Sequence, residues 1–482
     1  MAKHNKRNTL FGLLLAASCL TPATAIAQET SIEERLDRLE SLVETLITRM
    51  DQKEQQGEQD RAMVAEVKQA VEETRELAER TEQVERKAEE VGRKAEKVEL
   101  QIVEVNDKLI ANRDVLGDGF KVGNTSITYG GYVKMDAISE RTSGGVVDSS
   151  SIARDFLIPG LIPVGGDASG FDTDFNIRQT RFFFKTATDV GDDHTLSSVI
   201  ELDFMVTAGG NERISNSFVP RVRQAYLTYD NWLFGQTWST FQDVGALPET
   251  LDFIGVTPGT VFDRQPLIRY TNGGLQVAVE QPETTVTTPT GARVIGNNDS
   301  LPDLVLRYNY TRDWGRITLA GIGRALSVDE NVFNLESDSA FGYGISLSGK
   351  INVGERDDLR FMASAGDGIG RYVGLNLVND AAVRADGSLD PIATYSGFVA
   401  YRHFWSPKLR TTIAGSYFKA DNPVSLTTNG VTDQSTNGFI NLVYSPVPPL
   451  NLGIEYLYAD RELENGLSGN LQKIQVSAQY SF

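Results

Sequence analysis

Cysteine and histidine are almost absent from this sequence of 482 residues. It has one cysteine, Cys19, and three histidines, His4, His194 and His403. One cysteine cannot form a disulfide within the chain, and without paired histidines the usual spacing of zinc ligands is missing. His194 falls in a short turn, and His403 falls in a strand without an obvious serine or aspartate partner, so a hydrolase nucleophile with its base is not indicated. We therefore expect no enzyme activity, no metal site and no cofactor.

Long apolar runs and excess positive charge are also missing. After the first 27 residues no run approaches the roughly 20 apolar residues that a transmembrane helix needs. The formal net charge is -19, which argues against general nucleic-acid binding because such proteins favour a basic face.

The N-terminus has the parts of a secretory signal peptide. Basic residues between Lys3 and Arg7 precede the apolar run LFGLLLAASCL, and Ala25-Ile26-Ala27 forms a small-x-small cleavage site. A lipoprotein signal ending at Cys19 is the alternative, but Ala16 stands where a lipobox normally has leucine. We expect residues 1–27 to be removed, which leaves an exported protein without cysteine.

Residues 28–116 have the heptad pattern of a coiled coil. Apolar residues occur at Leu36, Leu39, Val43, Leu46 and Met50, in alternating steps of three and four. The pattern resumes after a polar spacer and continues to Leu109, with a break in register between Ala78 and Val84. A single helix cannot bury such a seam, so the segment predicts oligomerisation; a solvated charged helix is the alternative. Residues 117–124 are interpreted as a linker.

Residues 125–482 alternate strands with short and long connections, and contain no convincing helix. About sixteen segments rich in aromatic and β-branched residues are bounded by Gly, Asn, Asp and Pro. They begin near Thr125, Asp174, His194, Arg221, Trp232, Phe262, Leu275, Leu301, Gly315, Ala340, Asp358, Thr394, Lys408, Ser435, Asn451 and Leu471. Every second connection is short, whereas those between are mostly long and polar, such as 140–173, 281–300 and 373–393. This sorting is typical of an outer-membrane β-barrel with periplasmic turns and external loops.

The last strand illustrates the two faces that such a barrel needs. From Ile474 onward apolar and polar residues alternate strictly, ending at Phe482. In a barrel of about sixteen strands the lumen is wide enough to hold water. We therefore expect Ile474, Val476 and Tyr480 to face lipid and the alternate polar residues to face the channel.

Several short stretches resemble a known family. GGYVKMDAIS, RQTRFFFKT and the run from RQAY to GQTWSTF, together with the signal peptide and heptad segment, are similar to the DcaP-like trimeric outer-membrane porins. The resemblance implies a homotrimer of sixteen-stranded barrels in outer-membrane lipid of a Gram-negative cell, with the coiled coil in the periplasm. It also implies uptake of small anions such as dicarboxylates, and a constriction loop at about 244–260. Phe482 resembles the terminal aromatic residue that the barrel-assembly machinery recognises.

In a porin the site is the narrowest part of the lumen, where charge and size filter the solute. Strand alternation points several basic residues inward, and acidic residues lie in the proposed inserted loop. The candidate substrate path comprises Lys134, Arg181, Arg223, Arg264, Arg269, Arg307, Asp243, Glu249 and Asp252. Arginine suits this role because its planar fork binds carboxylates bidentately. We expect the acidic residues to form a wall opposite the arginines.

Competing interpretations concern both the charges and the heptad segment. The charges could instead pair across the lumen and keep the pore ordered, and the excess of acidic residues in the barrel segment argues against anion preference. A general porin is then the alternative. The heptad segment could also tether the barrel to peptidoglycan or to a periplasmic partner.

Overall fold

The computed structural model describes residues 37–45, 119–192, 194–206, 215–296, 300–328 and 338–482. The chain divides into two compact units, Met1–Glu99 and Leu100–Phe482. In the first unit residues 37–45 are helical. The signal peptide and nearly all of the heptad segment, including its break in register, lie outside the described residues.

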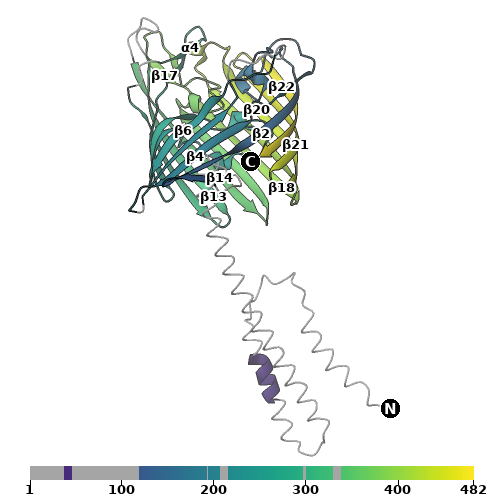
Figure 1. The fold of residues 1–482 in the computed structure, drawn as a ribbon. Coiled ribbons are helices and arrows are strands. Elements are labelled where there is room, and N and C mark those ends of the chain that lie inside the picture. The colour runs from purple at the N-terminus through teal and green to yellow at the C-terminus, as the bar shows by residue number, and fades with distance from the viewer. Residues whose placement is uncertain (1–36, 46–118, 193, 207–214, 297–299, 329–337) are drawn as a thin grey trace, which may run out of the picture. The chain divides into compact units, whose positions relative to one another are not determined.

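The second unit is a closed antiparallel β-barrel (Figure 1). Its main sheet has 18 named strands among the described residues, but β3 and β4 both pair with β2 as two parts of one barrel strand. β1 (Phe120–Val122) is a short addition to the same β2. The wall therefore has sixteen strands. They are β2 (Thr125–Thr142), β3 with β4 (Asp172–Asn176 and Arg181–Asp189), β5 (Thr195–Asp203), β6 (Arg221–Tyr229), β7 (Trp232–Trp238), β8 (Arg264–Asn272), β9 (Leu275–Glu280), β12 (Asp303–Arg312), β13 (Gly315–Val328), β14 (Asp338–Val353), β15 (Asp357–Asp367), β18 (Ala393–Ser406), β19 (Leu409–Asp421), β20 (Thr432–Val447), β21 (Leu450–Leu463) and β22 (Ser468–Ser481).

The first and last strands close the barrel. β2 pairs with β22 from Tyr132 opposite Ser481 to Thr142 opposite Leu471. The backbone N–H groups of Gly131 and Phe482 each donate to the other residue's carbonyl over 3.1 Å. Gly131 is required here, since a Cβ would lie 2.0 Å from the carbonyl oxygen of Arg181. Because the barrel closes, no strand edge is left with backbone N–H and carbonyl groups that lipid could not hydrogen-bond.

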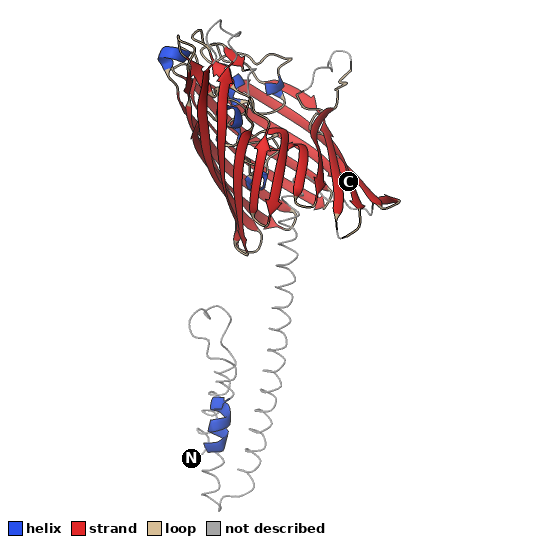
Figure 2. Cartoon of the chain, turned by 90° about the vertical axis from the view of Figure 1, so that its left-hand side faces the viewer, coloured by secondary structure: helices blue, strands red, loops and turns tan. Residues whose placement is uncertain are grey.

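Connections differ in length at the two ends of the barrel, as the sequence predicted. The turn between β6 and β7 consists of Asp230 and Asn231, whereas residues 143–171 connect β2 to β3. The long connections carry a small sheet of β10 (Thr285–Thr287), β11 (Arg293–Ile295), β16 (Ala381–Val383) and β17 (Leu389–Pro391). They also carry short helical turns, seen in blue in Figure 2: η1 (Ile152–Arg154), η2 (Pro159–Leu161), η3 (Val244–Ala246), η4 (Thr257–Gly259), η6 (Gly370–Tyr372) and α4 (Val424–Thr427).

Two sequence-based expectations need correction at this level. The segment interpreted as a linker contains β1, because Gly123, with φ of 62°, turns Phe120–Val122 back onto β2. The expectation of no helix after Gly123 missed the 3₁₀ turns and α4, which are too short to produce a periodic pattern.

The outer surface of the barrel is apolar and the inner surface is polar. Ile474, Val476 and Tyr480 are 41%, 49% and 53% exposed, while Lys473 and Gln475 between them are 1% exposed. β12 has the same alternation, with Leu304 and Leu306 outside and Arg307 buried inside. An apolar outer belt around a polar interior is the surface that a membrane barrel presents to lipid.

Leu306 gives a direct test of that outer face. Replacing this outward side chain in the middle of β12 with arginine should lower the free energy of unfolding by about 2–4 kcal/mol, as charged residues do near a bilayer midplane. Tyr310→Arg, nearer the end of the strand, should cost at most about 1 kcal/mol. Urea titration of the protein folded into lipid vesicles measures both; equal costs at the two positions would contradict the expected depth dependence.

Candidate functional site: the charged interior of the barrel

Residues 239–263, which we call the inserted loop, connect β7 to β8 and fold against inward-facing side chains. Phe241, Val256 and Val261 are at most 1% exposed and belong to an apolar cluster shared with the barrel wall. Asn437 on β20 donates from Nδ2 to the carbonyl of Gly255 over 2.5 Å. At Gly259 the loop backbone approaches β18 so closely that a Cβ would lie 2.1 Å from the carbonyl oxygen of Gly397. The loop is therefore held along the inside of the wall.

Asp243 fastens one end of the inserted loop to β12, β13 and β14. Arg307 Nη2 and Arg316 Nη2 donate to Asp243 Oδ1 over 3.1 and 2.5 Å, and Ser348 donates to Oδ2 over 2.9 Å. Burial alone would raise the pKa of Asp243, but the two guanidinium groups outweigh it and hold the pKa below its ordinary value. Asp243 is therefore a charged anchor.

Asp252 fastens the far part of the inserted loop to β22. Its Oδ2 accepts from Lys473 Nζ and, over 3.0 Å, from the backbone N–H of Leu157. Burial opposes ionisation of Asp252, yet the ammonium of Lys473 keeps its pKa below the usual range. Nearby, Lys134 on β2 donates from Nζ to the carbonyl of Leu251 over 2.5 Å and lies 3.2 Å from Asp136.

Glu249 binds the wall between these two anchors. Arg410 on β19 donates to its two carboxylate oxygens over 2.7 and 2.6 Å, and Arg402 on β18 lies 3.5 Å away. Burial opposes ionisation of Glu249, but the guanidinium groups of Arg410, Arg402 and Arg360 together hold its pKa below the ordinary value.

The structure corrects the expectation that these acidic residues form a wall opposite the arginines. Asp243, Glu249 and Asp252 turn toward the wall behind the inserted loop and pair with cations there. Lys134 and Arg307, also in the candidate substrate path, hold the loop as well and are 4% and 6% exposed. Strand alternation gives the direction of a strand residue, but it does not give the direction of a loop side chain.

A second charged group lies on β4, β5, β6 and β8. Arg223 is 2% exposed and donates to Glu201 over 2.5 Å and to Asp203 over 2.8 Å. Arg221 Nε donates to the same Asp203 over 2.7 Å. Arg221 and Arg223 lie two positions apart on β6 and therefore share its inner face, and the register shift between β5 and β6 at this point lets Gln224 be buried as well. The buried charge of Arg223 is thus compensated by its neighbours.

Arg181 and Arg264 border this group and are less compensated. Arg181 Nε lies 3.9 Å from Glu201, and its side chain is 20% exposed. Arg264 sits 4.7 Å over the ring of Trp238 and lies within electrostatic reach of Arg181, Arg221 and Arg223. Arg181 Nε, Arg264 Nη1 and Trp238 Nε1 are buried donors with no hydrogen-bond partner among the described residues. We call Arg181, Trp238 and Arg264 the donor cluster.

Arg269 is not part of the donor cluster. It faces inward on β8, beside Leu233 and Ala278, but lies five positions along the strand from Arg264, toward the short turn. The structure therefore brings Arg181, Arg223 and Arg264 together and leaves Arg269 at another height.

A further connection, residues 368–392, also folds inward, although the sequence interpretation treated most of it as a polar external loop. Ile369, Tyr372 and Val373 are at most 1% exposed and pack with the inserted loop. Phe262 N–H donates to the carbonyl of Tyr372 over 2.9 Å. Arg324 on β13 binds Asp380 of this segment over 2.7 Å. The apolar residues within 369–378 were the signal that could have revealed this.

Comparison with protein families identifies the barrel. Residues 122–482 match the family model described as DcaP outer membrane protein. The chain belongs to this family. It is thus an outer-membrane β-barrel of the porin type, and the sixteen-strand fold agrees with that assignment.

A solved structure of the same family has the same fold, and weaker likenesses to other porins are found beside it. The crystal structure of the outer membrane channel DcaP of Acinetobacter baumannii is 25% identical, with a TM-score of 0.62 over 76% of this chain and 100% of that chain. OmpT of Vibrio cholerae is 13% identical with a TM-score of 0.45, covering 76% and 100%. An anion-selective porin from Comamonas acidovorans is 12% identical with a TM-score of 0.47, covering 74% and 100%. No curated protein matches the sequence.

Several functional contacts of this DcaP-family barrel were missed by the sequence interpretation. Arg316, Arg410 and Lys473 hold the inserted loop, yet none was in the candidate path. Strand alternation gives the inward direction of these three residues, so the sequence did contain a signal for them. The sequence contains no such signal for Trp238, since an aromatic residue near a strand end also suits the membrane girdle.

Among the described residues, no group of three His, Cys, Asp or Glu side chains is arranged to hold a metal ion. In the same residues, no helix has the length and apolar character needed to span a membrane.

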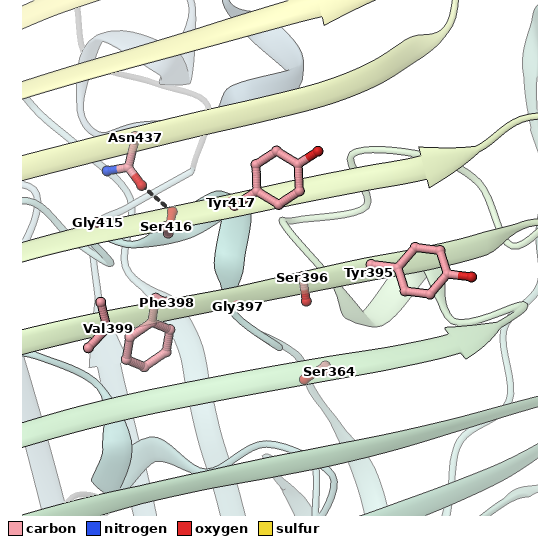
Figure 3. A pocket seen from close by; sticks show the side chains of 10 residues that line it. All are labelled: Ser364, Tyr395, Ser396, Gly397, Phe398, Val399, Gly415, Ser416, Tyr417 and Asn437. Atoms are coloured by element: carbon pink, nitrogen blue, oxygen red, sulfur yellow. Dashed lines mark hydrogen bonds between the residues drawn. The ribbon is translucent and has the colours of Figure 1, made fainter.

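The outer wall has a shallow pocket of about 620 Å³ on β15, β18, β19 and β20 (Figure 3). Tyr395, Val399 and Tyr417 on its rim are among the exposed, outward side chains. Gly397 lies opposite Tyr417, and Gly415 lies opposite Val399. The pocket thus arises where two glycines leave gaps between large side chains, and it is separate from the donor cluster.

The Lys473–Asp252 pair generates a prediction about the inserted loop. Asp252→Asn removes the ion-pair partner of a buried ammonium, which should cost about 3–5 kcal/mol. Adding Lys473→Met should restore most of that loss. Denaturant unfolding measures the cost, and hydrogen exchange at Leu157 reports release of the loop. Asp386→Asn, in an exposed turn, is the matched control; if it equals Asp252→Asn, the ion pair does not anchor the loop.

Proposed function

We propose that this porin admits small hydrophilic solutes by passive diffusion and favours small anions such as dicarboxylates. The inserted loop forms the constriction, and Arg181, Arg223 and Arg264 form the basic side of the path. Lys134, Arg307, Asp243, Glu249 and Asp252 take part by keeping the loop in place. Arg269 contributes a further inward cation nearer the short turns.

The donor cluster is the observation that supports the proposal. Its three buried groups without partners, Arg181 Nε, Arg264 Nη1 and Trp238 Nε1, are all donors. A buried donor without an acceptor is costly, and a carboxylate supplies acceptors at several positions. Around the cluster four guanidinium groups, of Arg181, Arg221, Arg223 and Arg264, share the carboxylates of Glu201 and Asp203. The local charge is therefore positive.

The anchors explain how an acidic protein can favour anions. The carboxylates of Asp243, Glu249 and Asp252 are each paired with a cation of the wall. Selectivity in a pore depends on the charges that line its narrow part. Net charge over the whole chain does not describe those residues.

Ion selectivity tests the proposal. In a planar bilayer under a KCl gradient, the reversal potential should indicate chloride preference, and millimolar succinate should reduce the current. Arg181→Gln and Arg264→Gln together should lower the chloride preference and weaken the block by roughly tenfold or more, since each charged hydrogen bond contributes about 1.5–3 kcal/mol.

Arg312→Gln is the matched control, because Arg312 is exposed on the outside of β12 and sits over Tyr310. It should leave the reversal potential unchanged. Cation preference of the unaltered protein without succinate block would overturn the anion proposal and leave a general porin.

We propose in addition that three copies assemble in the outer membrane, with residues 28–116 as a periplasmic coiled coil. The terminal residue Phe482 would serve recognition by the barrel-assembly machinery. The centroid of its ring lies 6.0 Å from that of Phe182, and its backbone closes the barrel.

Native mass spectrometry of the protein in detergent should give three times the mass of one chain. Deleting residues 32–109 should lower the trimer fraction; a monomeric unaltered protein contradicts the assembly.

A further inference from the structure

Two arginines near the loop end of the barrel have no acidic partner among the described residues. Arg293 on β11 donates from Nε to Asn379 Oδ1 over 2.5 Å and from Nη2 to the carbonyl of Asn376 over 2.6 Å. Arg461, near the loop end of β21, donates from Nε to Thr432 Oγ1 over 2.9 Å and from Nη1 to the carbonyl of Gly160 over 2.6 Å. Each guanidinium is oriented by neutral acceptors alone.

The two side chains belong to one place in the fold. Arg461 holds the connection 143–171 at Gly160, and Arg293 holds the connection 368–392 at Asn376 and Asn379. These connections touch, since a Cβ on Gly160 would lie 3.5 Å from Leu377 Cδ1. Arg293 is also within electrostatic reach of Arg461. Two fixed cations therefore flank the contact between two inward-folded loops.

Their positive charge is not neutralised by nearby carboxylates. Asp380 is the acidic group that influences Arg293, but Arg324 already binds it over 2.7 Å. Asp460 and Glu462, next to Arg461 in β21, alternate to the outer face. Arg293 Nη1 and Arg461 Nη2 donate no hydrogen bond within the described residues, and both guanidinium groups retain donors for a ligand.

Two other arginines of the molecule provide a contrast. Arg223 is paired with two carboxylates, and Arg384, in the same small sheet region as Arg293, pairs with Asp390 over 2.8 Å. A guanidinium that is already neutralised attracts an anion weakly. Carbonyl, amide and hydroxyl oxygens orient Arg293 and Arg461 without neutralising them, and such preorganisation favours tight anion binding.

We propose that Arg293 and Arg461 form a capture site for small dicarboxylates at the loop end of the lumen, separate from the donor cluster. One carboxylate binds Arg293 and the other binds Arg461. The inference rests on the proposed anion uptake, because the capture site would be the first binding step of that uptake. Binding itself does not require transport. The site raises the local concentration of the anion before it reaches the donor cluster.

Protection from arginine modification tests the site on the unaltered full-length protein in lipid nanodiscs. Phenylglyoxal reacts with free guanidinium groups, and mass spectrometry follows each residue. Succinate at about ten times its Kd should slow modification of Arg293 and Arg461 roughly tenfold, because the rate follows the unoccupied fraction. Succinamide, which has the same shape without charge, should not protect. Arg384 is the internal control and should react at one rate throughout.

Absence of protection, equal protection by succinamide, or equal protection of Arg384 would overturn the capture site. Arg293→Gln with Arg461→Gln should raise the succinate concentration needed to block current from the loop side, with the chloride preference retained. With Arg461→Lys in place of Arg461→Gln, part of the sensitivity to succinate block should return. That result would show that the loss comes from the missing charge and not from misfolding. Protection by succinate in a protein with cation preference would preserve the capture site and overturn the proposed uptake, so the two failures are distinguishable.

Discussion

Closure of the backbone hydrogen-bond network is the constraint on which the rest of this barrel depends. Lipid cannot satisfy a free N–H or carbonyl, so the sheet must return to its own first strand, as it does where Phe482 meets Gly131. Once the sheet is closed, every strand has one face toward lipid and one toward the interior. Apolar side chains then occupy the outside, and charged side chains are confined to a limited interior where they must find partners or water.

The interior charges fall into two classes because of that confinement. Lys473, Arg307, Arg316 and Arg410 meet carboxylates of the inserted loop and fasten it to the wall. Breaking such a buried pair leaves an uncompensated charge, so the loop is held far more firmly than surface ion pairs would hold it. Arg181, Arg264, Arg293 and Arg461 meet few or no carboxylates, and these residues carry the proposed anion chemistry.

Apolar packing inside the barrel accompanies the ion pairs. Side chains of the inserted loop and of residues 368–392 join inward wall residues such as Phe398 and Phe418 in a single cluster. This core uses inward positions of β18 and β19, so the inner face of those strands carries apolar side chains beside polar ones. That is why connections that look external in the sequence fold inward: their apolar residues have a surface inside the barrel to cover.

The sequence by itself determined the barrel, because strand alternation, turn residues and loop length are local properties. Thr125, Arg221, Trp232, Leu275 and Gly315 begin strands at the expected positions, and the inward direction of Arg181, Arg223, Arg269 and Arg307 follows from their place in a strand. Only the tertiary structure decided which charges meet. Asp252 and Lys473 are 221 residues apart in the chain, and Glu249 and Arg410 are 161 apart. Their pairing depends on distances that exist only after the sheet has closed and the loop has entered it, and the same distances leave Arg264 and Arg461 without a salt bridge among the described residues.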